Sequence, residues 1–266
     1  MAFLNDYHVH TDNSMDCKFP MASMCEQALQ AGVREIAFTD HLNHHLLDLD
    51  LGFYRADKYF ADVEACRARY PDLKILAGIE LGEPHRWWKR IAPIVDNYPY
   101  DLILGSVHWV GKESMFDANY YRGREPQQAY HEYFEEVVQM VNHGGFDILA
   151  HVDLPKRTAY GIYGAFDAAA LEDDFRAVWQ ACIDNYITPE INTKSLRLSV
   201  AEAHPNMDAL RWYVEMGGKR LTFGSDAHTP DSIGSGMGEA RRIALGAGLH
   251  YICHFEGRRI IQWSPL

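Results

Sequence analysis

The chain has 266 residues, of which 47% are hydrophobic, and its formal net charge at pH 7 is −12. This length fits one domain with a sizeable core, so we expect residues 1–266 to form a single domain. The acidic balance, with no block of Lys or Arg, argues against a nucleic-acid surface, which normally carries a basic stripe.

Other features of the sequence bear on location and partners. No stretch of about 18 consecutive apolar residues occurs, so we expect no membrane span. The first residues, MAFLNDYHVH, lack the basic and apolar regions of a signal peptide, which predicts a cytoplasmic protein. The five cysteines are odd in number and show no CxxC spacing, so we expect reduced, structural cysteines. No feature of the sequence specifies an oligomeric state.

Short apolar runs alternate with longer helical patterns along the whole chain. The predicted strands are 6–10, 35–39, 74–80, 102–107, 147–151, 188–192 and 220–224. The predicted helices are 21–31, 58–70, 88–97, 127–142, 168–185, 207–216 and 238–246. A strand followed by a helix, repeated about seven times, predicts an α/β protein built as a (β/α)7 barrel of the TIM type.

Residues that can bind metal end these strands or follow them closely. In the first strand, His8 and His10 point to the same side because side chains alternate along a strand. A single histidine at a strand end is usually structural. Here, however, seven segments supply candidates: His8 and His10, Asp16, Asp40 and His41, Glu80, His108, His151, and Asp226 with His228. Because the site of such a barrel lies at the carboxyl ends of its strands, this set predicts a multinuclear metal site there.

Three long segments are expected to form loops on the same face as these residues. They span 42–54, 109–125 and 155–166, and all carry aromatic or charged side chains. Loops at this end of a barrel commonly carry function, so we expect them to build the substrate pocket. Among the aromatic residues of the chain, Trp109 is the first candidate for the pocket rim, although aromatic side chains also serve as core.

Seven motifs in this order resemble the PHP (polymerase and histidinol phosphatase) family over essentially the whole chain. They are HVHTDNSMD, FTDH, GIE, GSVHW, AHVDLPKR, INTKSLR and GSDAH. Within the family, the segments GSVHW, HVDLPKR, INTKSLR and GSDAHTPDSIG most resemble the monofunctional histidinol-phosphate phosphatases.

The resemblance implies a distorted (β/α)7 barrel with three divalent metal ions. It assigns the first ion to His8, His10, Glu80 and Asp226, the second to Glu80, His108 and His151, and the third to Asp16, His41 and His228. Glu80 would therefore bridge two ions. Asp16 stands where some relatives have His, which changes the charge of the third site. Zinc, iron and manganese all accept these ligands, so the sequence leaves the metal open.

Three further residues are candidates for catalysis. Arg157 follows the fifth strand and Arg197 follows the sixth, so both are placed to reach the mouth of the site. A guanidinium group can contact phosphate in a bidentate manner, although either arginine could instead form a surface salt bridge. Asp40 could orient His41 or donate a proton, and orientation is the simpler role. Weaker candidates in the same segments are Lys156, Asn192 and Ser195.

The expected function is metal-dependent hydrolysis of a small phosphomonoester, with L-histidinol phosphate as the preferred substrate and L-histidinol and phosphate as products. A metal-bound hydroxide would attack the phosphorus while the ions neutralise the phosphate oxygens. A PHP phosphoesterase acting on a nucleotide or another phosphorylated metabolite would share the barrel and the metals, and would differ in its loops.

Other classes fit the sequence less well. A proofreading exonuclease would need a basic groove. An amidohydrolase commonly has a bridging lysine, whereas Glu80 ends the third strand here. A non-catalytic metal-binding domain is disfavoured because all nine ligand positions are intact.

Overall fold

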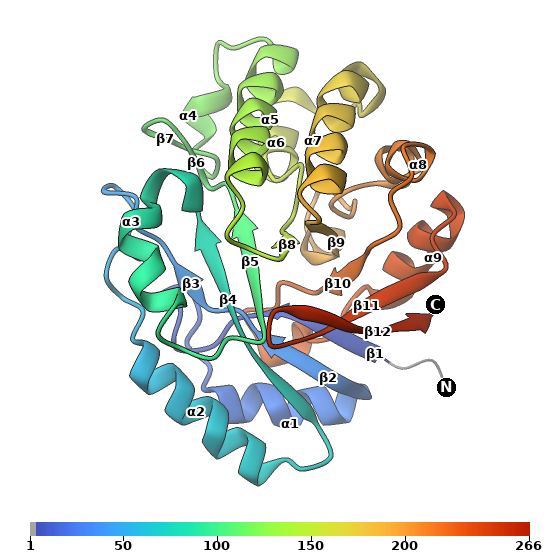
Figure 1. Ribbon diagram of the computed structural model, residues 1–266. Coiled ribbons are helices and arrows are strands. Elements are labelled where there is room, and N and C mark those ends of the chain that lie inside the picture. The colour runs from blue at the N-terminus through green and yellow to red at the C-terminus, as the bar shows by residue number, and fades with distance from the viewer. Residues whose placement is uncertain (1–3) are drawn as a thin grey trace.

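In the computed structural model, which describes residues 4–266, seven parallel strands form a barrel (Figure 1). Their hydrogen-bonded order follows the chain: β1 (Leu4–Val9), β2 (Val33–Phe38), β4 (Lys74–Gly82), β5 (Leu102–Ser106), β8 (Ile148–Leu149), β9 (Thr188–Asn192) and β10 (Thr222–Gly224). A short strand, β3 (His41–Leu42), is a third parallel partner of β4, beside β2 and β5. All seven strands expected from the sequence are present. The domain prediction for residues 1–266 stays a prediction, and its first three residues lie outside the described chain.

The first strand meets the end of the last one and nearly closes the barrel. Val9 forms a parallel bridge with Ala227, and the His10 amide donates to the Ala227 carbonyl at 2.9 Å. Strand β1 shifts register between Asp6 and Val9, which indicates a β-bulge. The strand order and this closure confirm the expected distorted (β/α)7 barrel.

Helices follow the strands and surround the barrel (Figure 1). They are α1 (Met21–Ala31), α2 (Ala56–Arg69), α3 (Pro84–Val95), α5 (Pro126–His143), α7 (Glu172–Asp184), α8 (Met207–Glu215) and α9 (Met237–Ala247). Each buries an apolar face, as the spacing of Tyr133, Val137 and Met140 in α5 illustrates. The large hydrophobic core lies between these helices and the outer faces of the strands.

Two of the expected loops contain secondary structure. Residues 155–166 were expected to be a loop, which is wrong, because they contain α6 (Lys156–Tyr163). This helix is hard to see in the sequence because Thr158, Gly161 and Ile162 have low helix propensity. The segment 109–125 holds the hairpin β6 (Trp109–Val110) and β7 (Glu113–Ser114) and the short helix α4 (Ala118–Tyr121).

An antiparallel hairpin that the sequence analysis did not predict closes the amino end of the barrel. It consists of β11 (Tyr251–Glu256) and β12 (Arg259–Pro265). Arg258, in its turn, donates to the Asp147 carboxylate and to the Asp101 carbonyl, both just before barrel strands. Apolar side chains of the barrel interior pack against Cys253 and Phe255 of the hairpin. Polar groups therefore gather at the opposite, carboxyl end.

In the described part of the chain, every helix is too short or too polar to span a lipid bilayer.

The close contact of strand β5 with Phe146 gives a stability test. A Cβ at Gly105 would lie 2.7 Å from atoms of the buried Phe146 ring. We expect Gly105→Ala to lower the free energy of unfolding by about 1–3 kcal/mol, because the ring must move within a packed core. Urea denaturation measures this change.

The matched control is Gly238→Ala in α9, where an added Cβ meets no atom within 4 Å. Alanine favours the helix there, so stability should rise by about 0.5–1 kcal/mol. Equal stability of wild type and Gly105→Ala would contradict the packing described for β5.

Candidate metal centre

The nine predicted metal ligands converge at the carboxyl ends of the barrel strands. His8, His10 and Glu80 are fully buried at the bottom of this cluster. His41 and His228 are only 10% and 15% exposed, whereas the side chain of Asp16 is 51% exposed. The rings of His41 and His228 lie 4.3 and 4.1 Å from that of His10, measured between centroids. The cluster therefore has a buried floor and an open side.

Glu80 lies at the centre of the cluster, and its two carboxylate oxygens face five imidazoles. Oε2 is 3.3 Å from His8 Nε2, 3.6 Å from His10 Nε2 and 3.0 Å from His41 Nδ1. Oε1 is 3.4 Å from His108 Nε2 and 2.9 Å from His151 Nε2. This position suits a carboxylate that bridges two metal ions.

Strand pairing explains how Glu80 reaches its neighbours. The strand β3 pairs with β4 so that His41 stands beside Glu80, and the Glu80 amide donates to the Asp40 carbonyl at 3.1 Å. His151 and Asp226 follow strands β8 and β10 and have φ angles of 30° and 51°. Such left-handed backbone is costly outside glycine and clusters at functional sites.

Three groups of residues have ligand atoms close enough to hold an ion. They are His8, His10 and Asp226; His8, Glu80 and His151; and His10, His41 and His228. The first and third groups share most members with the sets expected from the sequence. In the second, His8 stands in place of His108. The described residues thus provide several overlapping ion positions, and the assignment of each ligand to a particular ion stays a prediction.

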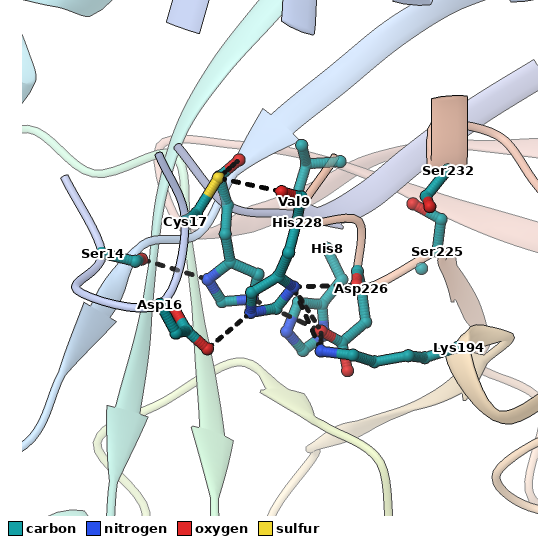
Figure 2. A network of polar contacts seen from close by, with 12 residues as sticks. His8, Val9, Ser14, Asp16, Cys17, Lys194, Ser225, Asp226, His228 and Ser232 are labelled. Carbon is teal, nitrogen blue, oxygen red and sulfur yellow. Dashed lines mark hydrogen bonds and ion pairs between the residues drawn. The ribbon is translucent and has the colours of Figure 1, made fainter. Parts of the chain in front are cut away.

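The open side of the cluster is formed by His228 and its neighbours. Figure 2 shows the His228 ring between Asp16 and Lys194, close to Asp226. Asp16 Oδ2 lies 2.8 Å from His228 Nε2, and Lys194 Nζ lies 3.1 Å from His228 Nδ1. Lys194 Nζ also donates to Asp226 Oδ1 at 2.9 Å. A cation therefore stands beside two of the predicted ligands.

A second layer of residues fixes the orientation of the buried imidazoles. Glu190 of β9 accepts from His8 Nδ1 at 2.8 Å, which leaves His8 Nε2 free to bind metal. His10 Nδ1 lies 3.2 Å from Ser14 Oγ, and Ser14 Oγ donates to Asp40 at 2.7 Å. His10 Nδ1 therefore donates to Ser14, and its Nε2 is the available ligand atom.

Asp40 acts on the loop rather than on the ring of His41. Its carboxylate accepts from the Thr11 amide at 2.7 Å, the Thr11 hydroxyl at 2.8 Å and Ser14 Oγ. Burial raises the pKa of Asp40 to about 6, although these donors oppose the increase. Asp40 does not line the cavity, so its contacts give no support to the proton-donor alternative.

The cluster has the electrostatic features of a cation site. His10 Nε2, His41 Nδ1 and Glu80 Oε1 are buried, and no described residue offers them a partner in hydrogen-bond geometry. Burial alone would lower the pKa of His8, but Glu190 and Glu80 raise it well above its ordinary value. The carboxylates thus draw positive charge into a buried place. Divalent ions would supply that charge and satisfy the unpaired ligand atoms.

A cavity of about 580 Å³ opens above the cluster. Its floor includes seven of the nine predicted ligands: Asp16, His41, Glu80, His108, His151, Asp226 and His228. Its walls come from the segments 42–54 and 109–125, as expected, and include Asp48, Asp50, Trp109 and Phe116. This volume is that of a small-molecule site.

The two predicted arginines differ in position. Arg157 lines the cavity, and its Nη2 lies 3.3 Å from Asp226 Oδ2. Arg197 does not line the cavity and instead donates to the Ser225 carbonyl at 2.7 Å. The contacts of Arg197 therefore do not support its predicted phosphate role. Lys194, which the sequence analysis passed over, is the second cation of the cavity wall.

Sequence reasoning missed Glu190 and Lys194 for different reasons. Glu190 lies two residues before Asn192 in β9, so both point into the barrel, and this alternation could have identified it. Lys194 begins the 3₁₀ turn η2 (Lys194–Arg197), whose direction no periodic pattern specifies. Among the aromatic candidates, Trp109 does line the cavity, with its indole donating to Asp48 at 2.7 Å.

Comparisons with known proteins agree with this architecture. The PHP domain family matches residues 6–194 of the chain. A Clostridium acetobutylicum protein named "Probable histidinol-phosphatase" is 28% identical over 264 residues, which cover 97% of this chain and 99% of that protein. The histidinol-phosphatase of Lactococcus lactis is 26% identical over 260 residues, which cover 96% of this chain and 95% of that protein.

A solved structure extends the similarity to three dimensions. It is the crystal structure of histidinol phosphate phosphatase from Lactococcus lactis, complexed with zinc, L-histidinol and phosphate. The TM-score is 0.89 at 24% sequence identity, and the match covers 98% of this chain and 100% of that chain. The two proteins therefore share their fold over their full lengths.

The central position of Glu80 gives the test of the metal centre. We expect wild type to bind about three divalent ions per chain, and Glu80→Gln to bind fewer, because one substitution weakens two ion positions. Turnover should fall by more than the roughly 10²–10⁴-fold typical of losing one acid–base group. Elemental analysis and phosphatase assays measure both quantities.

Glu136→Gln is the matched control, because Glu136 is a buried carboxylate that pairs with His85 and Arg86 outside the cavity. It should lose stability but keep its metal content. Full metal occupancy and normal turnover in Glu80→Gln would rule out the bridging role.

Proposed function

This chain belongs to the PHP domain family, and from that premise we propose that it hydrolyses L-histidinol phosphate to L-histidinol and phosphate with the help of bound divalent metal ions. The relatives named histidinol-phosphatase, matched over nearly their whole lengths, support this substrate. The enzyme is a phosphoric monoester hydrolase, and its substrate is a small phosphorylated metabolite.

The observation that carries the proposal is the placement of Glu80 on the floor of a cavity that also presents cationic side chains. Glu80 faces five imidazoles and is fully buried. Arg157 and Lys194 line the same cavity above it. A site with unpaired ligand atoms below and fixed cations above suits a phosphate monoester, which carries about two negative charges at neutral pH.

The ions would be held by the nine residues that converge on the floor of the cavity, with zinc, iron or manganese as candidates. Bound there, the ions neutralise phosphate charge and provide hydroxide at neutral pH. Glu190 and Ser14 hold His8 and His10 in the tautomers that leave both Nε2 atoms available. This preorganisation lowers the cost of assembling the site.

Arg157 and Lys194 are proposed to bind the phosphate oxygens. The Arg157 guanidinium offers several N–H groups in one plane, whereas Lys194 offers a compact charge. Both approach Asp226, at 3.3 and 2.9 Å, so their charges lie beside the ligand cluster. They can therefore hold the phosphate group against the floor of the cavity.

Another part of the cavity wall is suited to a cationic group. Asp48 and Asp50 line it, and Trp109 stacks on His45 with ring centroids 4.1 Å apart. L-Histidinol phosphate carries a protonated amine and an imidazole beyond its phosphate. Its two ends thus match the cationic and the acidic sides of the cavity, which favours it over a plain phosphomonoester.

The different positions of the two arginines generate a prediction. Arg157→Lys keeps the charge but loses the planar group of donors, so kcat/KM for L-histidinol phosphate should fall roughly 10–100-fold, the range for losing hydrogen bonds to a charged group. Arg197→Lys should lose much less, because Arg197 does not line the cavity. A greater loss in Arg197→Lys would return the phosphate role to that residue. Steady-state kinetics with measured metal content decides between them.

The substrate itself is tested with purified protein reconstituted with zinc, manganese or iron. We expect kcat/KM for L-histidinol phosphate to exceed that for nucleoside monophosphates by at least about 100-fold, because a nucleoside monophosphate has no protonated amine to pair with Asp48 and Asp50. Phosphodiesters serve as negative controls. Equal activity on all monoesters would contradict the substrate, and activity confined to nucleotides would favour the nucleotide phosphoesterase alternative.

A further inference from the structure

A row of buried polar side chains leads from Arg157 into the protein interior. Asp153, His204 and Ser195 are all fully buried, and none of them lines the cavity. Asp153 Oδ1 lies 2.7 Å from His204 Nδ1, and His204 Nε2 lies 2.6 Å from Ser195 Oγ. Ser195 Oγ in turn accepts from Arg157 Nε at 3.2 Å. We call Asp153, His204 and Ser195 the buried triad.

With a neutral His204 ring, the hydrogen bonds of the buried triad run in one direction. Arginine has no acceptor, so its Nε–H must donate to Ser195 Oγ. Burial and nearby Lys156 lower the pKa of His204 to about 3, so its ring is neutral at pH 7. The single ring N–H, on Nδ1, donates a hydrogen bond to the Asp153 carboxylate. His204 Nε2 therefore accepts a hydrogen bond from the Ser195 hydroxyl, and the Ser195 lone pairs face Arg157.

The buried triad is fixed at both ends. Lys156, also fully buried, donates to Asp153 at 2.8 Å and to Glu202 at 3.0 Å. His204 exchanges two backbone hydrogen bonds with Asn192 at the end of β9, at 2.8 and 2.9 Å. Buried charges are tolerated when they are paired and hydrogen-bonded in this way. The position of Ser195 relative to the barrel is therefore well defined.

The residue types are those of a serine hydrolase, but the geometry excludes that role. Such an enzyme needs its serine hydroxyl exposed to substrate. Ser195 is fully buried, does not line the cavity and has Arg157 Nε as a neighbour where a substrate carbonyl would have to approach. The hydroxyl instead contacts a residue that faces the cavity.

We propose that the buried triad positions Arg157 for the phosphate group, with Ser195 acting through the arginine and never on the substrate itself. Nε is held by Ser195 and one Nη2 hydrogen faces Asp226, so the plane of the guanidinium is set before substrate arrives. Preorganised donors lose less entropy on binding than mobile ones. This inference rests on the proposed function, because it assigns Arg157 to phosphate.

The test is a double-mutant cycle between Ser195 and Arg157. Ser195→Ala removes the acceptor of Nε–H, so kcat/KM for p-nitrophenyl phosphate and inhibition by inorganic phosphate should both weaken roughly tenfold, the size expected for one hydrogen bond to a charged group. Metal content should not change. In the Arg157→Lys background, which has no Nε–H, Ser195→Ala should cause little further loss.

Three further variants keep the result interpretable. Ser195→Thr retains the hydroxyl and should restore most of the activity. Ser195→Cys fills the same space with a weakly hydrogen-bonding thiol and replaces Ser195→Ala if that variant does not fold. Ser106→Ala removes another buried hydroxyl, which donates to the Leu81 carbonyl at 3.1 Å, and should leave phosphate inhibition within about twofold of wild type.

The outcomes separate this inference from the proposed substrate. Equal loss from Ser195→Ala in both backgrounds, or no loss in either, would overturn the positioning role. Failure to hydrolyse L-histidinol phosphate would leave the cycle measurable with p-nitrophenyl phosphate. If no monoester is hydrolysed, the rise in melting temperature caused by inorganic phosphate gives the same comparison, and additive losses there would also overturn the inference.

Discussion

Burying the Glu80 carboxylate at the end of a barrel strand would cost several kcal/mol if no positive charge or donor compensated it. The chain meets this constraint by directing five imidazoles at its two oxygens, from β1 and the residue that follows it, from β3, and from the segments after β5 and β8. These residues lie far apart in sequence, and the nearly closed barrel brings them together at one end. The metal centre therefore depends on the barrel. Hydrophobic side chains fill the amino end of the barrel, so the polar ligands gather at the carboxyl end.

Residues around this centre orient the ligand side chains, although they do not contact the ligand atoms themselves. Glu190 selects the tautomer of His8, while Asp40 acts on His10 through Ser14. Such supporting hydrogen bonds commonly affect metal affinity and activity by 10–100-fold. The buried triad orients Arg157 in the same way. Hydrogen bonds from the protein interior thus fix both the proposed phosphate-binding arginine and the metal ligands.

The sequence contained enough information for the barrel and the ligand set because both depend on position along strands. The shared direction of His8 and His10 at the end of β1, and the position of Glu80 near the end of β4, follow from side-chain alternation, which does not depend on distant residues. Contacts made by residues on turns were harder to predict from the sequence. Lys194 lies on a 3₁₀ turn, and Arg197, three residues later, points to the Ser225 carbonyl. Helix α6 was read as a loop because its residues have weak helical propensity, and the hairpin β11–β12 is specified by its contacts with the barrel end.

The chain is strongly acidic, yet its proposed site binds an anion. The short range of electrostatic forces in salt solution explains how both can hold. At physiological ionic strength, charges separated by more than about 8 Å in solvent are largely screened, so the net charge of the surface has little effect inside the cavity. There, Arg157, Lys194 and the proposed ions decide the local potential. Asp48 and Asp50, which also line the cavity, would then add selectivity, because they repel a second phosphate and attract an amine. The same two carboxylates would disfavour free phosphate relative to the proposed zwitterionic substrate, which would help the product anion to leave.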